Sequence, residues 1–287
     1  YTHPDLAATM CHNPDEIPGN GVDDDDNGYV DDVYGIDAAN GDSNPMDDQG
    51  HGTLTAGIAG AAGNNGVGGV GVTWNSKILA CKFITSAGTG TDSDAIECFN
   101  YIIALKQRGI NIRISNNSYG AAREDPPALA LKDAIDAAGV AGILNVFAAG
   151  NDGTDNDAIP FDPAGFDSPS IISVAASDGA DNKPAFSNYG ATSVDLAAPG
   201  DFIFGPALGG SYTFSSGTSM AAPMVSGAAA LLLANDSTLT VDQLKARILT
   251  SVDVLPQWGG VVATGGRLTV LNAISNGGNS PPSVTAG

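Results

Sequence analysis

Short apolar segments alternate with helix-like segments through most of this chain, and this alternation constrains the fold more than any other feature. The strand-like runs are apolar almost without interruption, and the segments between them carry apolar residues at helical spacing. Strands without polar alternation are typical of a parallel sheet buried on both faces. We therefore predict a three-layer α/β sandwich, with a mostly parallel sheet flanked by helices and joined by right-handed crossovers.

The pattern also predicts where the elements lie. Strands are expected at 78–84, 110–114, 142–149 and 171–176. Helices are expected at 54–62, 95–107, 128–138, 241–252 and 266–273, with another that opens near 219 and ends near 235. Residues 1–50 are polar and are expected to form a long ligand-holding loop region, whereas 276–287 has the composition of a linker toward a further module. The predicted domain therefore spans 1–275.

Composition and charge exclude several classes of function. Hydrophobic residues make up 43% and charged residues 15%, which fits a globular chain. The net charge, 11 Lys and Arg minus 32 Asp and Glu, is −21, so nucleic acids and anionic membranes are not expected as partners. No apolar run reaches the roughly 20 residues that cross a bilayer. Residues 1–5 resemble neither a signal peptide nor a natural N-terminus, so we expect a processed or truncated chain. We also expect a monomer.

Three cysteines are too few for a disulfide scaffold. Cys81 lies in a strand-like segment and Cys98 in a helix-like one, whereas Cys11 lies in the polar N-terminal region. Both a bridge between Cys81 and Cys98 and a pair of reduced, buried thiols fit the sequence.

Ser219 lies in the run Gly-Thr-Ser-Met-Ala-Ala-Pro at 217–223, where a loop passes into an Ala/Leu-rich helix. Unpaired backbone N–H groups at a helix start favour developing negative charge, which a nucleophilic serine needs. Serine is also a common helix N-cap, so the run alone does not decide between the two roles.

Two further segments carry groups that could act with this serine. His51 lies between glycines that allow close approach of backbone and substrate, whereas His3 and His12 fit ordinary surface positions. Asn151 follows a buried strand, at the edge of a parallel sheet where active sites assemble. Its amide could donate to an oxyanion, or the residue could simply shape a turn.

Together these motifs resemble those of the subtilisin-like serine protease family, the subtilases. Residues 50–53 resemble the family's histidine motif, and residues 217–223 match its serine motif. Residues 149–151 resemble its oxyanion-asparagine motif, and residues 117–120 resemble the strand that pairs with substrate. The resemblance covers residues 1 to about 275 in order and spacing. Leu54 replaces a histidine that the family usually has, and Tyr119 stands where Trp or Leu is common.

The resemblance implies a role for each of these residues. Ser219 would attack the scissile carbonyl while His51 takes its proton, and Asn151 with the Ser219 N–H would bind the oxyanion, supported by Thr218. The backbone groups of one segment would pair with an extended peptide; these belong to Ser118, Tyr119 and Gly120. The small residues of a second segment would line the primary specificity pocket; these are Ala148, Ala149 and Gly150.

The third member of the family's catalytic triad, an aspartate, has no counterpart among these residues. The resemblance implies that this aspartate lies on the first strand of the fold, five residues before Tyr1. The first strand is therefore expected to be missing. We therefore expect a secreted serine endopeptidase acting on proteins or peptides, severely impaired in this chain, with a pro-peptide as a candidate inhibitor. The alternative is a non-catalytic subtilase-fold protein that binds peptides or serves as a scaffold. An esterase of the α/β-hydrolase type is disfavoured because no Gly-x-Ser-x-Gly elbow is present.

The acidic run at 23–32 indicates a calcium site. Alternate oxygens followed by Gly28 are similar to the first half of an EF-type loop, although the twelfth position is Tyr34 instead of Glu. A solvated acidic turn is the alternative. The candidate ligands here are Asp23, Asp25, Asn27, the Tyr29 carbonyl, Asp31 and Asp32.

The family resemblance implies a second calcium site. Residues 64–70 are similar to the family's calcium loop, and Asp195 matches a weaker cation site of the family. Hard oxygen ligands favour Ca²⁺ over zinc. The ligands of the second site would be Asp5, Asn65 and the carbonyls of Gly63, Val67 and Gly69.

Overall fold

Six strands form the main sheet of the computed structural model, which describes residues 1–124 and 127–275; the predicted linker at 276–287 lies outside them. The strand order is β11-β12-β8-β7-β5-β3, parallel except for β11. The strands are β3 (Ile114–Asn117), β5 (Leu144–Ala148), β7 (Ile171–Ser177), β8 (Leu196–Pro199), β11 (Asp253–Val254) and β12 (Gly266–Arg267).

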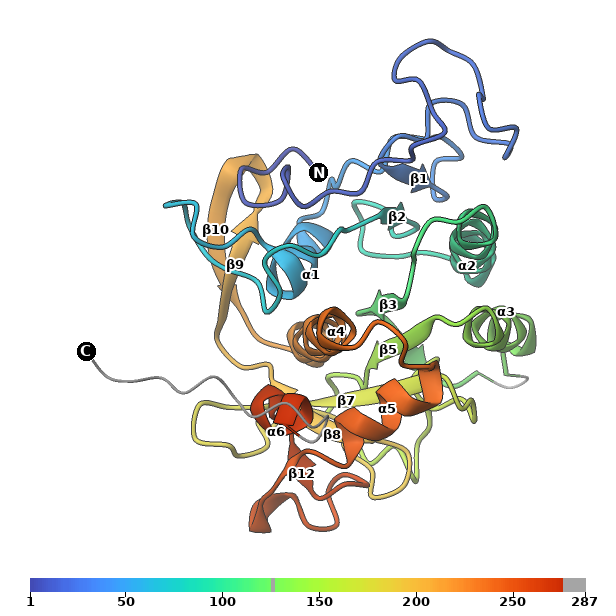
Figure 1. Cartoon of the computed structure of the whole chain (residues 1–287). Coiled ribbons are helices and arrows are strands. Elements are labelled where there is room, and N and C mark those ends of the chain that lie inside the picture. Colours follow the sequence, from blue (N-terminus) through green and yellow to red (C-terminus); the bar gives the residue numbers. More distant parts are fainter. Residues whose placement is uncertain (125–126, 276–287) are drawn as a thin grey trace.

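Two strands stand apart from this sheet as a separate parallel pair. They are β1 (Gly35–Asp37) and β2 (Ala80–Lys82), and α2 (Asp92–Gln107) connects β2 to β3. Figure 1 shows β2 between β1 and β3. Within the described residues, neither β2 nor β3 has a strand partner on its other side. The predicted single sheet is therefore present in two parts.

Helices cover both faces of the main sheet (Figure 1). On one side lie α2 and α3 (Leu129–Val140); on the other lie α1 (His51–Gly60), α4 (Thr218–Asn235), α5 (Val241–Leu249) and α6 (Val270–Ser275). Strand β5 contacts the helices on both faces of the sheet. Val146 and Ala148 belong to the apolar cluster that includes α4, whereas Phe147 belongs to the cluster that includes α3. Successive strand residues point to opposite faces, so both must be apolar. Buried α4, long and apolar enough to cross a membrane, is here the core helix, with 67% of its span inside the protein.

A β-hairpin projects beside α1 and leads into the serine motif. It consists of β9 (Ile203–Ala207), a 3-10 turn at Leu208–Gly210 and β10 (Ser211–Ser215), paired antiparallel. Strand β9 lies against α1, since a Cβ on Gly57 would meet the Pro206 ring. A smaller pair, β4 (Ala121–Ala122) with β6 (Phe161–Asp162), and a 3-10 turn at Pro256–Trp258 complete the elements.

Several predicted elements differ from those observed. The strand expected at 110–114 begins only at Ile114, because Lys106 and the 110–113 segment make the turn out of α2. The helix expected at 266–273 is wrong at its start, since Gly266–Arg267 pairs as a strand with β8 and β11 before α6 begins. The helix expected at 54–62 begins earlier, at His51. Strands β1, β8, β9 and β10 were not predicted, being short or carrying no long apolar run.

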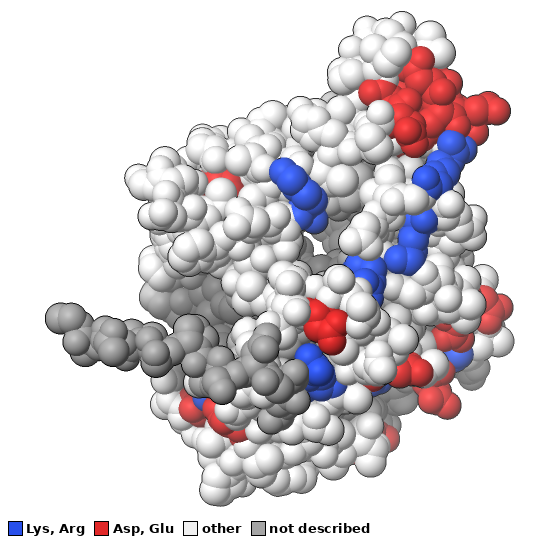
Figure 2. All heavy atoms as spheres, in the orientation of Figure 1, with Lys and Arg blue, Asp and Glu red and all other residues white. Residues whose placement is uncertain are grey.

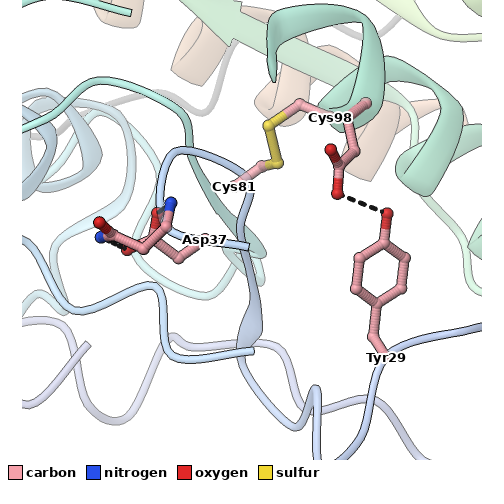
Figure 3. Close-up of a disulfide and its surroundings, with 6 residues drawn as sticks. Tyr29, Asp37, Cys81 and Cys98 are labelled. Carbon is pink, nitrogen blue, oxygen red and sulfur yellow. Dashed lines mark hydrogen bonds between the residues drawn. A yellow bond between two sulfur atoms is a disulfide. The ribbon is translucent and has the colours of Figure 1, made fainter. Parts of the chain in front are cut away.

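A disulfide joins Cys81 of β2 to Cys98 of α2, which settles the two alternatives left open by the sequence (Figure 3). Cys11 is free. On the same side of α2, the Tyr29 hydroxyl donates to Glu97, so the N-terminal loop and β2 are both attached to this helix.

Candidate active site

Ser219 is the second residue of α4 and is joined to the end of β3 by a reciprocal pair of hydrogen bonds. Its Oγ donates to the Ser118 carbonyl at 3.2 Å, and the Ser118 Oγ donates to the Ser219 carbonyl at 2.8 Å. Gly217, not Ser219, is the N-cap, so the capping role considered for Ser219 is wrong. The serine hydroxyl is half-buried at a helix start, where free N–H groups lie.

Asn151 lies next to this helix start, held by Thr218. The Asn151 Oδ1 accepts from the Thr218 N–H at 2.8 Å and from its hydroxyl at 3.1 Å. Thr218 is fully buried, and its hydroxyl also bonds both backbone groups of Gly150. Because Oδ1 is occupied, the Asn151 amide N–H groups are the part of this exposed side chain available to a ligand.

The glycine before Asn151 fits its place for a steric reason. Gly150 has φ 109, and a Cβ there would lie 2.3 Å from the Asn188 amide. Asn188 in turn accepts from the backbone N–H of Asp152 and Thr154, so the turn that presents Asn151 is fixed from both sides.

His51 is the first residue of α1, whose start packs against the start of α4. Leu54 and Ile58 of α1 form one apolar cluster with Met220, which directly follows Ser219. Packing of the two helices thus brings the predicted base and nucleophile to the same end of the molecule. Within the described residues, no hydrogen bond of the His51 ring is present.

Asp47 shapes the turn that presents His51. Its carboxylate accepts from the N–H groups of Gln49, Gly50 and Thr53 and from the Thr53 hydroxyl, at 2.6–2.9 Å. Burial raises the pKa of Asp47, but the Thr53 hydroxyl and these three N–H groups outweigh it, so the net pKa lies below its usual value. This carboxylate therefore stabilises the start of α1, a role that no pattern in the sequence predicted.

The imidazole is kept neutral by its surroundings. Burial lowers the pKa of His51, and the negative charge of Asp47 offsets this only in part. A neutral imidazole can accept a proton, as a general base must.

The predicted substrate segments lie on either side of Ser219. Gly120 is exposed and Ser118 half-buried, at the end of β3. The Tyr119 side chain instead turns inward against Phe83 and Phe147, with its hydroxyl buried and without a partner. The predicted pocket residues 148–150 are all buried: Ala148 packs under α4, and Ala149 packs with Trp258.

The acidic loop gathers three carboxylates, and these only partly match the predicted set. Ligand atoms of Glu16, Asp23 and Asp25 all lie within 4.8 Å of one another. Asp25 Oδ1 is buried without a hydrogen-bond partner, with the Arg108 guanidinium 3.7 Å away. Figure 2 shows the acidic side chains concentrated at this end of the molecule. A buried carboxylate oxygen without a hydrogen bond, next to two further carboxylates, fits a hard cation such as Ca²⁺, and Arg108 already supplies one positive charge there.

The other predicted residues of this loop have structural roles. Asp31 accepts from the N–H groups of the turn at 19–21. Asp32 is fully buried and accepts from Asn13, Asn27 and the Tyr101 hydroxyl of α2. Burial and the bond to Glu97 raise the pKa of Tyr29 to about 12. Glu16, which bonds the N–H groups of Asp24, Asp25 and Asp31, was not predicted, because it lies outside the dense acidic run.

The second predicted calcium site has no such orphan. Asp5 is fully buried, and its two oxygens accept from the Asn65 amide, the Gly69 N–H and the Tyr212 hydroxyl at 2.8–3.0 Å. These donors satisfy both oxygens of the Asp5 carboxylate, whereas Asp25 Oδ1 in the acidic loop has no hydrogen bond.

At the predicted weaker site, a lysine of α5 influences the carboxylate of Asp195 electrostatically. The Asp195 carboxylate accepts a hydrogen bond from the Ser173 N–H. Lys245 of α5 donates to the carbonyl of Ile171. Burial raises the pKa of Asp195, and the ammonium of Lys245 partly offsets it. The Lys245 ammonium thus acts electrostatically on this carboxylate, at the position for which the resemblance implies a weaker cation site.

Comparisons with known proteins agree with this geometry. Residues 1–277 match the model of the Subtilase family. Among curated relatives, Subtilisin-like protease 1 of Plasmodium berghei (strain Anka) is 33% identical over 96% of this chain and 48% of its own length. Thermitase of Thermoactinomyces vulgaris is 33% identical, covering 84% of this chain and 81% of its own. The chain thus spans about half the length of the first of these relatives.

A solved structure shares the architecture. A cold-adapted subtilisin-like serine proteinase superposes with a TM-score of 0.69 and 28% identity, covering 93% of this chain and 88% of its own. The predicted α/β fold is thereby confirmed. With a family match along nearly the whole sequence and the serine, histidine and asparagine segments gathered at one end, the chain belongs to the subtilase family.

Proposed function

We propose that this chain is the peptidase domain of a serine endopeptidase that acts through an acyl-enzyme on Ser219. Ser219 Oγ attacks the scissile carbonyl as its proton passes to His51, and the oxyanion accepts from the Asn151 amide and the Ser219 N–H. His51 then protonates the leaving amine, and water repeats the sequence on the ester. The observation that carries this proposal is the bond pattern of Thr218, which fixes Asn151 with its donors free.

We also propose that residues 1–287 alone hydrolyse peptides poorly. His51 has no carboxylate partner among the described residues, and the oxygens of Asp47 are occupied by the helix start. An imidazole without such a partner is not held in the tautomer that accepts from serine. The unpaired edges of β2 and β3 are the place where a further strand carrying a carboxylate could join the fold.

A fluorophosphonate probe tests the proposed nucleophile directly. Labelling should occur on Ser219 and should be lost in Ser219→Ala, while Ser216→Ala, three residues upstream, keeps it. No labelling of Ser219, even with an added N-terminal strand, would favour the alternative, a non-catalytic peptide-binding subtilase. That alternative is supported by the Ser219 Oγ, which donates to Ser118 instead of the imidazole.

We propose that the carboxylates of Glu16, Asp23 and Asp25 bind a calcium ion that stabilises the fold. At a concentration about 100 times its dissociation constant, calcium should add about 2.7 kcal/mol to the free energy of unfolding. We expect EGTA to lower the Tm and Asp25→Asn to remove that response. Asp15→Asn, in the same loop but outside the cluster, is the matched control. An unchanged Tm with EGTA would exclude the site.

Secretion is proposed on the strength of the Cys81–Cys98 disulfide, since such bonds persist in oxidising compartments. Polypeptides are the proposed substrates and a pro-peptide the proposed inhibitor. The net charge of −21 argues against nucleic acid as a partner.

A further inference from the structure

Strand β10 is an exposed edge strand that carries none of the usual protection against pairing. Ser211, Thr213 and Phe214 are all exposed, and within the described residues β10 pairs only with β9. Of its outward backbone groups, the Ser211 carbonyl accepts from His3. Natural edge strands are commonly blunted by charges, proline or a bulge, and β10 has no charged residue and no proline.

One face of the same hairpin presents a continuous row of aromatic rings. Phe202 stacks on Phe214 at 4.6 Å between centroids, Phe214 contacts Phe204 at 5.1 Å, and Phe204 stacks on Tyr212 at 5.5 Å. Phe202 is 72% and Phe214 is 53% exposed, so these rings contact each other and solvent. Contiguous exposed apolar surface of this kind marks an interaction site.

The exposed surroundings of the row are apolar, and the Tyr212 hydroxyl at one end of the row donates to the buried carboxylate of Asp5. Val67 and Val70, also exposed, belong to the neighbouring loop, where Gly69 approaches the Phe204 ring. No Asp, Glu, Lys or Arg occurs in 202–235 or in 52–76, although the whole chain has a net charge of −21. A hairpin without charged side chains on so acidic a protein matches an uncharged, apolar partner.

The hairpin is also tied to the candidate active site. Strand β10 ends at Ser215, four residues before Ser219, and a Cβ on Gly50 would lie 3.4 Å from the Leu208 side chain at the hairpin turn. A segment bound along β10 would therefore extend toward Ser219, which the chain reaches four residues after the strand ends.

We propose that β10 docks an extended, uncharged, apolar segment of the polypeptide that is to be cleaved. The segment pairs with the free backbone edge of β10, and its alternate side chains pack on the row formed by Phe202, Phe204, Tyr212 and Phe214. This inference rests on the proposed peptidase function and adds a second contact for unfolded or apolar substrates.

Two other occupants fit the observations less well. A second copy of the chain would bring together two proteins of net charge −21. A lipid surface would leave the edge N–H and C=O groups of β10 unpaired, and the hairpin has no Lys or Arg to contact headgroups.

Binding of a labelled peptide tests the proposal without relying on turnover. The probe is a short fluorescein-labelled peptide that alternates Phe or Val with Thr, and its matched partner has Ser in place of Phe and Val. The protein carries Ser219→Ala so that the probe stays intact. We expect the Kd of the apolar probe to rise about tenfold or more in Phe202→Ser/Phe214→Ser and in Thr213→Lys.

Leu129→Ser, which removes an equally exposed apolar side chain on α3, should leave that Kd within about twofold. The proposal is overturned if both hairpin variants bind the apolar probe as tightly as the parent. It is also overturned if the variants abolish self-association in sedimentation, or binding to phosphatidylcholine vesicles, with peptide binding unchanged. Fluorophosphonate labelling of the Ser219 form reports the proposed function separately, so a chain that binds the probe but is not labelled retains only the docking surface.

Discussion

The two halves of the candidate active site are supported very differently. Ser219 and Asn151 are held by side-chain and backbone hydrogen bonds that connect α4 to β3 and to the end of β5. His51 is positioned by the start of α1, whose turn is held by Asp47, and its ring has no hydrogen bond among the described residues. The structure thus fixes the serine and asparagine segments by several hydrogen bonds, whereas the His51 ring has none within the described residues.

The largest expected effect comes from supplying that partner. An N-terminal extension that pairs between β2 and β3 and places an Asp beside His51 should raise kcat for a peptide ester by about 10⁴-fold, a magnitude known from removal of the Asp in subtilisin. The same extension with Asn is the control. Full activity in the unextended chain would show that His51 needs no added carboxylate partner.

Removing the oxyanion donor should have the next largest effect. In the extended form, Asn151→Ala should lower kcat by about 10²- to 10³-fold, again a magnitude known from subtilisin. Asn111→Ala, at an exposed position after α2, should leave kcat unchanged. Equal rates for both variants would place the oxyanion donor elsewhere.

A smaller effect is expected from the residue that holds Asn151. Thr218→Val keeps the volume but removes the hydroxyl bonds to Asn151 and Gly150. Each lost bond is worth about 1 kcal/mol, so we expect kcat to fall about tenfold with KM unchanged. A rise in KM at constant kcat would instead assign Thr218 to substrate binding.

The smallest effect concerns the charge of the base itself. Because burial lowers the pKa of His51 below 6.5, the unfolded chain binds the proton more readily than the folded one. This contribution to stability is therefore present above pH 6.5 and is lost as the pH falls through that value toward the folded pKa. An NMR titration of the ring should show the lowered pKa, and Asp47→Asn should lower it further. A pKa above 6.5 would contradict the burial argument.

How far the sequence predicts this molecule depends on the range of the contacts. Continuous apolar runs predicted β5, β7 and the long core helix α4, because burial on both faces leaves no other pattern. The short β1 and β12 are strands only through their partners.

The candidate site divides in the same way. Motifs pointed to Ser219, His51 and Asn151, since the groups that react must be of particular types. The Asp47 bonds to the α1 start and the Glu16 contacts across the acidic loop depend on how distant or irregular segments fold back, and no local pattern announces them.

The separation of β1 and β2 from the main sheet has a consequence for native-state fluctuations. A two-stranded sheet is only marginally stable alone, so this pair is expected to open as a sub-global unit at a free energy below that of complete unfolding. The Cys81–Cys98 bond attaches β2 to α2 across 17 residues and limits how far that unit can separate. In hydrogen exchange, amides of β1 and β2 should therefore exchange well before those of β5 and β7, and reduction of the disulfide should widen that interval.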